Sequence, residues 1–92
     1  MSSFNYIYIL ESFAGDHLYV GIAKDLPKRL KEHNTGRSFS TKAYRPWRVI
    51  HYEAYINEDD AKRREKYLKT SQGARLLKRM LKEYFYAKKL KK

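Results

Sequence analysis

Two short runs of alternating aromatic and β-branched residues near the start of the chain constrain its fold most. Residues 6–10 and 17–22 form these runs, and residues 12–16 between them have the length and the glycine of a hairpin loop. The pattern predicts two antiparallel strands. Because side chains alternate along a strand, Ile7 and Ile9 point to one face, which looks like ordinary core.

The opposite face of this hairpin carries phenol side chains. Tyr8 lies on it in the first run, and in the second run alternation separates Tyr19 and Gly21 from the aliphatic residues Leu18, Val20 and Ile22. A glycine within a strand allows a ligand to approach the backbone closely. We therefore expect one face of the hairpin to be core and the other to be a candidate site.

Charge indicates the kind of partner. The chain has 21 Lys and Arg against 10 Asp and Glu, a formal net charge of +11, which favours a polyanion such as nucleic acid. Residues 1–23 contain no Lys or Arg, whereas residues 69–92 contain nine. The hairpin is therefore a neutral scaffold and the helical remainder carries the charge. Ribosome-bound and membrane-surface proteins share such a composition and stay open as alternatives.

The length of 92 residues allows one small domain. We expect it to span residues 1–92, with a core over about 4–86 and a basic tail over 87–92. The absence of cysteine excludes disulfides and thiolate zinc sites and favours a cytoplasmic protein. We find no leader and no apolar run near the roughly 20 residues that cross a bilayer, so we expect a monomer or weak dimer without membrane association.

A helix is predicted from Asp25 to about Gly36. Asp25 is a good N-cap residue, and Pro27 fits the first turn. Arg29 and His33 lie one turn apart beside the leucine stripe of this helix, so both side chains can point along the sheet. Taken alone, Arg29 is more often a surface residue and His33 a hydrogen-bonded boundary residue, so the sequence leaves both readings open.

A polar, basic loop is predicted over residues 35–46. Its cations are interleaved with Phe39 and Tyr44, a composition typical of surfaces that grip phosphates and stack bases. A solvated connector with two anchoring aromatic residues fits equally well. The candidate nucleic-acid contacts, including one residue from a later helix, are Arg37, Lys42, Tyr44, Arg45 and Lys69.

A third strand and a second long helix are predicted next. Residues 47–55 are rich in aromatic and β-branched residues, and Asn57 is a good N-cap with acidic residues in the turn that follows. Glu65 lies on the apolar stripe of this helix. A carboxylate there is costly unless it meets a cation, a metal ion or hydrogen-bond donors. It is either a functional group or the partner of Arg29 or Arg64 in an ion pair.

A last helix is predicted over residues 74–87, after a break at residues 70–73. His51, in the third strand, is expected to be structural, and we see no histidine metal site. The predicted order is β-β-α-β-α-α. We therefore expect an α+β fold in which helices flank a small three-stranded antiparallel sheet.

This arrangement resembles the GIY-YIG nuclease superfamily. The segment 6–8, Tyr-Ile-Tyr, stands where Gly-Ile-Tyr is usual, and the segment 19–21, Tyr-Val-Gly, where Tyr-Ile-Gly is usual. Arg29 matches the essential arginine of that superfamily, His33 a position often occupied by His or Tyr, and Glu65 the metal-binding glutamate. The resemblance covers residues 4–86. The chain looks most similar to the small stand-alone proteins of this superfamily, which are often described as similar to the N-terminal nuclease domain of UvrC.

The resemblance implies a metal-dependent endonuclease that hydrolyses phosphodiester bonds in DNA, with RNA also possible as a partner. Glu65 would hold one Mg²⁺ or Mn²⁺, with no small-molecule cofactor, and Arg29 would clamp the scissile phosphate. Tyr19, with Tyr8 beside it, would position and deprotonate the attacking water, and His33 would relay the proton or bind the phosphate. The alternative is a nucleic-acid-binding module that cleaves weakly or not at all.

Overall fold

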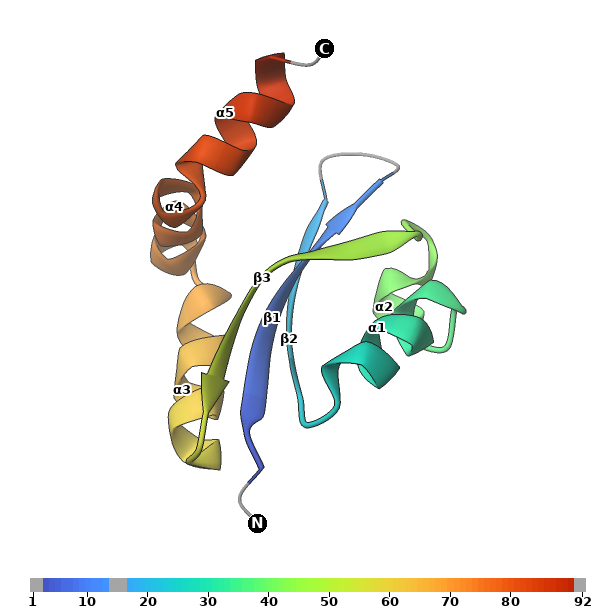
Figure 1. Ribbon diagram of the computed structural model, residues 1–92, viewed down its shortest axis with the longest axis vertical. Helices are drawn as coiled ribbons and strands as arrows, with labels where there is room; N and C mark the ends of the chain where they lie inside the picture. The colour runs from blue at the N-terminus through green and yellow to red at the C-terminus, as the bar shows by residue number, and fades with distance from the viewer. Residues whose placement is uncertain (1–2, 14–16, 91–92) are drawn as a thin grey trace.

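The computed structural model describes residues 3–13 and 17–90 and shows helices on both faces of a sheet (Figure 1). The elements in chain order are β1 (Asn5–Ser12), β2 (Leu18–Ala23), α1 (Leu26–Asn34), α2 (Phe39–Lys42), β3 (Trp47–Tyr55), α3 (Glu58–Leu68), α4 (Ser71–Met80) and α5 (Lys82–Leu90). None of these helices combines the length and the apolar composition that a membrane span requires. The α+β class and the predicted element order are confirmed.

The sheet is antiparallel and has the strand order β2-β1-β3, so the first strand is central and β2 is an edge. Tyr8 pairs with Gly21 on one side and with Tyr52 on the other. The register of β1 against β3 shifts between Ile9 and Leu10. The hairpin that the alternation predicts is therefore present, although the tip of its loop, residues 14–16, lies outside the described residues.

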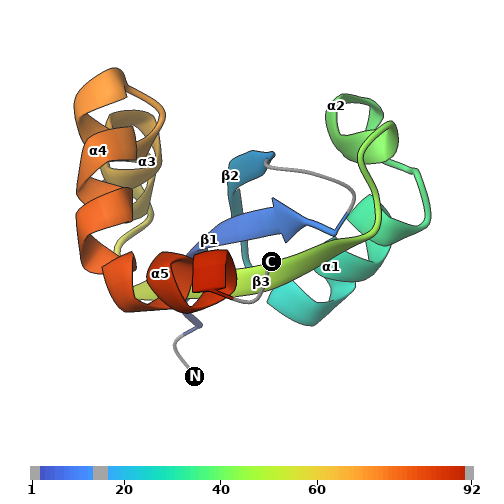
Figure 2. The same ribbon diagram turned by 90° about the horizontal axis from the view of Figure 1, so that it is seen from above.

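Each face of the sheet is covered by its own helices. Figure 2 shows α3 and α4 on one side of the strands and α1 and α2 on the other. Ile7 and Ile9 pack with Ala61, Leu68 and Leu77 beneath α3 and α4. Tyr8 and Leu10 pack with Trp47 and with the leucines of α1 on the opposite face. This division confirms the alternation of aliphatic and aromatic side chains along β1.

Side-chain caps start the helices where the sequence indicates. The Asp25 carboxylate accepts from the Lys28 amide at 3.1 Å, and Pro27 lies in the first turn of α1. The Asn57 side chain accepts from the amides of Asp59 and Asp60 and so starts α3. These bonds satisfy amides that have no partner within the helix.

Two segments differ from the prediction. The loop expected over residues 35–46 contains the single-turn helix α2, and the last helix begins at Ser71 and is divided at Leu81 into α4 and α5. Residues 70–73 do not form a gap, because the Thr70 hydroxyl accepts from the Gly73 amide at 3.1 Å and caps α4 directly. The sequence pattern showed a helix break but missed this cap.

Gly73→Ala is expected to destabilise the protein by about 1–3 kcal/mol, although alanine normally favours a helix. A Cβ atom at Gly73 would overlap the Tyr67 carbonyl oxygen and the Leu68 Cα, which are backbone atoms that cannot rotate away. Urea unfolding of Gly73→Ala and of the control Gln72→Ala, an exposed position in the same helix, measures the difference. Equal stability of the two variants would contradict the close packing of α3 against α4.

Candidate functional site

A buried hydrogen-bonded chain lies between α1 and the sheet. The Tyr8 hydroxyl lies 2.9 Å from His33 Nε2, and His33 Nδ1 lies 2.7 Å from Thr41 Oγ1. Tyr8 is 1% exposed and both His33 and Thr41 are 0% exposed. A strand, a long helix and the short helix α2 each contribute one member, so the fold as a whole holds this chain in place.

The Thr41 hydroxyl favours one proton arrangement in this chain. It donates to the Ser38 carbonyl oxygen at 3.4 Å, so its oxygen is free to accept from His33 Nδ1–H. His33 Nε2 then carries a lone pair and accepts the Tyr8 hydroxyl proton. His33 is thus placed as the proton acceptor of Tyr8.

Burial keeps His33 neutral. It lowers the pKa of His33, and the positive charge of Arg29 lowers this pKa further, while Glu32 opposes the shift. A neutral imidazole is the form that can accept the hydrogen bond from the Tyr8 hydroxyl. The sequence placed His33 beside the leucine stripe of this helix, at the boundary between core and surface, and the structure buries it completely.

Because the pKa of His33 is lowered in the folded state, stability is expected to fall as the pH decreases below the unfolded pKa near 6.5. There the unfolded chain takes up a proton that the folded chain does not. The loss between pH 7.5 and 5.5 is at most about 1.4 kcal/mol. Urea unfolding across this range should show a flatter pH dependence for His33→Gln than for the wild type, and equal slopes would contradict the prediction.

Tyr19 completes the aromatic part of the site. Its ring centroid lies 5.0 Å from that of His33 and 6.4 Å from those of Tyr8 and Trp47. Tyr19 is half-buried, so it is the more accessible of the two phenols. The Tyr8 phenol lies directly over Gly21, where any Cβ atom would overlap the ring and its hydroxyl. The glycine in β2 therefore makes room for Tyr8 itself, and not only for a ligand.

Arg29 lies at the solvent side of this group. Its guanidinium donates to Glu32 at 2.9 Å, and its side chain is 37% exposed. Burial raises the pKa of Tyr8 above its usual value, the Arg29 guanidinium acts in the opposite direction, and the negative charge of Glu65 raises it further. Tyr8 thus keeps its proton at neutral pH.

Glu65 lies on α3, which covers the other face of the sheet. Its side chain is 21% exposed and pairs with Lys69 at 3.1 Å. The ion pairs with Arg29 or Arg64 that the sequence left open are absent among the described residues. Arg64 instead binds Glu53 at 2.8 Å, where Arg64, His51 and Tyr55 outweigh the effect of burial and lower the pKa of Glu53 to about 2.

A divalent cation can be accommodated at Glu65 only as a sparsely ligated ion. The described residues contain no cluster of three or more His, Cys, Asp or Glu side chains suited to a metal. Mg²⁺ commonly takes one or two carboxylates and completes its coordination with water and phosphate. A partly exposed carboxylate with one mobile lysine partner fits that requirement, since Lys69 is half-exposed and can move aside.

The expected nucleic-acid contacts divide into two places. Arg37, Lys42, Tyr44 and Arg45 are exposed around α2, where Arg45 and Lys42 lie beside Gly36. The Tyr44 ring stacks on His17 at 3.8 Å between centroids, which gives this aromatic residue a structural partner. Lys69 lies apart from them, at the end of α3, and its ion pair with Glu65 was not predicted.

Sequence reasoning missed Thr41 and Glu32. Thr41 lies in a segment predicted as loop, and only the fold shows that its hydroxyl holds His33. Glu32 lies three residues after Arg29 on the same helix, a spacing that allows an ion pair and could have been noticed. The structure thus brings Tyr8, Tyr19, Arg29 and His33 into one group, with Glu65 near enough to influence the Tyr8 hydroxyl.

The chain is similar to known proteins over most of its length. The chain is 37% identical over 75 residues to a UPF0213 protein of Staphylococcus saprophyticus, an alignment that covers 80% of this chain and 90% of that protein. It is 31% identical to a UPF0213 protein of Haloquadratum walsbyi over 76% of this chain and 79% of that protein. It is 36% identical to a UPF0213 protein of Clostridium perfringens, over 71% of this chain and 70% of that protein.

No solved structure matches the chain. The names of the relatives state no activity. A model of the GIY-YIG catalytic domain matches residues 4–80, and nucleases with this domain generally use divalent metal ions. This match includes every residue of the candidate site, from Tyr8 to Glu65. The chain therefore belongs to the GIY-YIG catalytic domain family, a family of nucleases.

Proposed function

We propose that this protein is a metal-dependent endonuclease that hydrolyses phosphodiester bonds in DNA. The observation that supports this most is the Tyr8–His33–Thr41 chain, which lies beside Tyr19 and Arg29. Buried polar chains of this kind fix side-chain positions and are common at catalytic sites. We expect cleavage to be structure-selective or only weakly sequence-specific, with a role in repair, recombination or turnover.

In this proposal Tyr19 holds the attacking water and Tyr8 orients Tyr19. Tyr8 is buried and its pKa is raised, so it stays protonated and donates to His33. Tyr19 is accessible enough to contact a water molecule, and as the phenolate it would take one proton from that water as the water attacks. The division of labour between the two phenols follows from their different burial.

Arg29 would bind the scissile phosphate. The N–H donors of its planar guanidinium match two phosphoryl oxygens. The guanidinium would leave Glu32, to which it donates in this structure, and donate to the phosphate of the substrate. The negative charge that grows on these oxygens strengthens this contact in the transition state. Glu32 would then act as a positioning residue, which holds the guanidinium in place before the substrate binds.

Glu65 would hold Mg²⁺ or Mn²⁺ after Lys69 moves aside, and a bound ion would polarise a phosphoryl oxygen and assist the departing alkoxide. The Lys69 ammonium, released from Glu65, would be free to contact a neighbouring phosphate. Lys69 would thus pair with Glu65 before the metal ion binds and with a phosphate afterwards.

The direct test is incubation with branched, flapped and single-stranded DNA in Mg²⁺ or Mn²⁺. Arg29→Ala is expected to lower the cleavage rate by about 10²–10³-fold, because one preorganised donor to the transition state is lost. Arg63→Ala is the matched control, since Arg63 is exposed on α3 and pairs only with Asp60 among the described residues. Equal activity of wild type and Arg29→Ala would indicate a contaminating nuclease and would reject the proposal.

A nucleic-acid-binding module without cleavage is the second candidate. It is favoured by the closed ion pair of Glu65 and Lys69 and by the burial of Tyr8. The net charge of +11 serves either function. Tight DNA binding with no metal-stimulated cleavage of any substrate would select this second candidate.

A further inference from the structure

Two neighbouring pockets share two lining residues and together extend from Tyr19 to the last helix, and we call them the path. One pocket, of about 340 Å³, is lined by Tyr19 and Lys69 and extends to Leu18 and Lys78. The other, of about 490 Å³, begins at the same Leu18 and Lys78 and continues to Phe85. Both volumes fall in the usual range for ligand clefts, about 300–1,000 Å³. The path therefore runs on the α4 side of the sheet from Tyr19, whose ring contacts the candidate site on the α1 side, to α5.

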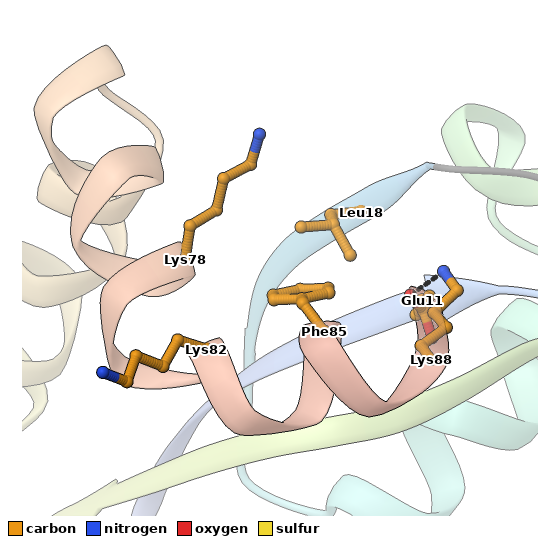
Figure 3. Close-up of a pocket in the computed structure, with 6 residues that line it drawn as sticks. All are labelled: Glu11, Leu18, Lys78, Lys82, Phe85 and Lys88. Carbon is orange, nitrogen blue, oxygen red and sulfur yellow. Dashed lines mark hydrogen bonds and ion pairs between the residues drawn. The ribbon is translucent and has the colours of Figure 1, made fainter. Parts of the chain in front are cut away.

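The lining of the second pocket combines cations with an apolar surface (Figure 3). Leu18 and Phe85 lie close together in its middle, with Lys78 on one side and Lys88 on the other. Lys82 lies on the rim, and its side chain extends away from Leu18. Among the described residues neither Lys78 nor Lys82 has a carboxylate partner, so both charges are available to a ligand.

The one carboxylate of this pocket is already neutralised. Glu11 is 2% exposed and accepts from Lys88, from the Tyr84 hydroxyl and from Arg48, the last at 3.1 Å. Burial would raise the pKa of Glu11, but these donors outweigh it and hold the pKa below its usual value. The carboxylate thus fixes α5 against the sheet, and its surroundings stay positively charged.

We propose that this path binds a single strand of nucleic acid that leaves the candidate site. The proposal rests on the proposed function and specifies the form of the substrate. Lys69, Lys78 and Lys82 would contact successive phosphates, and Phe85 with Leu18 would pack against a base or sugar. A basic groove with an aromatic platform is the general composition of sites for single strands.

The part of the path that α5 lines lies outside the segment that matches the GIY-YIG catalytic domain. Lys82, Phe85 and Lys88 follow residue 80, where the match to the GIY-YIG catalytic domain ends. The path lies along β2 and the α4 side of the sheet, whereas Arg37, Lys42 and Arg45 lie around α2 on the opposite side. A strand on this path is therefore separate from the phosphate contacts that the sequence predicts near α2.

The first test compares two double variants by fluorescence anisotropy with a labelled single-stranded DNA oligonucleotide, in buffer with EDTA to prevent cleavage. Lys78→Gln/Lys82→Gln is expected to weaken binding at least fivefold and to reduce the salt slope by about 1.4, at roughly 0.7 per lost phosphate contact. Lys62→Gln/Lys66→Gln removes the same charge from two exposed residues of α3 and should change binding less than twofold. Equal effects of the two double variants would overturn the proposal.

The second test addresses the aromatic platform. Phe85→Ala should weaken binding about fivefold or more, the contribution of stacking on one base, and Tyr86→Ala, an exposed neighbour in α5, should not. Thermal unfolding of both variants checks that α5 still docks. Ultraviolet crosslinking of an oligonucleotide with 5-iodouracil should label Phe85 in the wild type, and labelling confined to the α2 region would contradict the proposal.

The outcomes separate this inference from the proposed nuclease. If Arg29→Ala abolishes cleavage while Lys78→Gln/Lys82→Gln binds single strands like wild type, the nuclease stands and the strand path is rejected. If no protein cleaves DNA but the pocket variants still weaken single-strand binding, the strand path stands and the nuclease is rejected. Lys78→Gln/Lys82→Gln should weaken the binding of a duplex of the same sequence less than it weakens the binding of the single strand. An equal loss of affinity for both would also reject the path.

Discussion

DNA cleavage by Glu65→Gln is expected to fall at least about 100-fold, with DNA binding in EDTA retained. Loss of a residue that merely orients a metal ligand already costs about 10–100-fold, so loss of the proposed metal ligand itself should cost no less. Glutamine keeps the size of the side chain, so α3 should pack as before. A gel-based cleavage assay across Mg²⁺ and Mn²⁺ concentrations measures the effect.

Glu58→Gln is the matched control for this loss. Glu58 lies on the same helix, pairs with Lys62 at 3.6 Å and is exposed, so it reports the general effect of removing one negative charge from α3. Its cleavage rate should stay within about twofold of wild type. Comparable losses in the two variants would mean that charge, and not a metal site at Glu65, controls the rate.

Gly21→Ala is expected to abolish cleavage and to destabilise the protein by about 1–3 kcal/mol. A Cβ atom at this position would overlap the Tyr8 ring and hydroxyl, so the phenol must leave its place beside His33. The chain from Tyr8 to Thr41 would then be broken at its first bond. Urea unfolding and the cleavage assay, run on the same preparation, measure both consequences.

A second substitution separates these two effects. Tyr8→Leu should recover part of the stability of Gly21→Ala, because the smaller side chain removes the overlap, and it should not restore cleavage, because the hydroxyl is gone. Stability losses that simply add in the double variant would show that Gly21 and Tyr8 do not compete for this space. Retained cleavage by Gly21→Ala would remove Tyr8 from the site.

Local patterns were sufficient to predict most of the fold. Alternation along residues 6–10 predicted that Ile7 and Ile9 lie on a core face, and the capping residues Asp25 and Asn57 predicted where two helices begin. The division of the last helix at Leu81 could not be predicted in this way. Its apolar stripe continues across the break, and the docking of α5 depends on Glu11, which is distant in the sequence.

The sequence predicted that several candidate site residues lie near one another, but it did not predict their contacts. The strand and helix periodicities placed Tyr8, Tyr19 and Arg29 on compatible faces, and the structure brings them together. Partner choice is a tertiary property, so the sequence could not tell that His33 binds Thr41. For the same reason Lys69, and not an arginine, pairs with Glu65.

The order of the candidate site residues along the chain allows the protein to be cut into two fragments that each carry part of the site. Tyr8, Tyr19, Arg29 and His33 all precede the exposed Ile56, and Glu65 follows it. A cut at Ile56 would give one fragment with the phenols and the guanidinium and another with the carboxylate. Neither fragment alone would hold a complete site, so two proteins fused to these fragments would produce nuclease activity only when they meet.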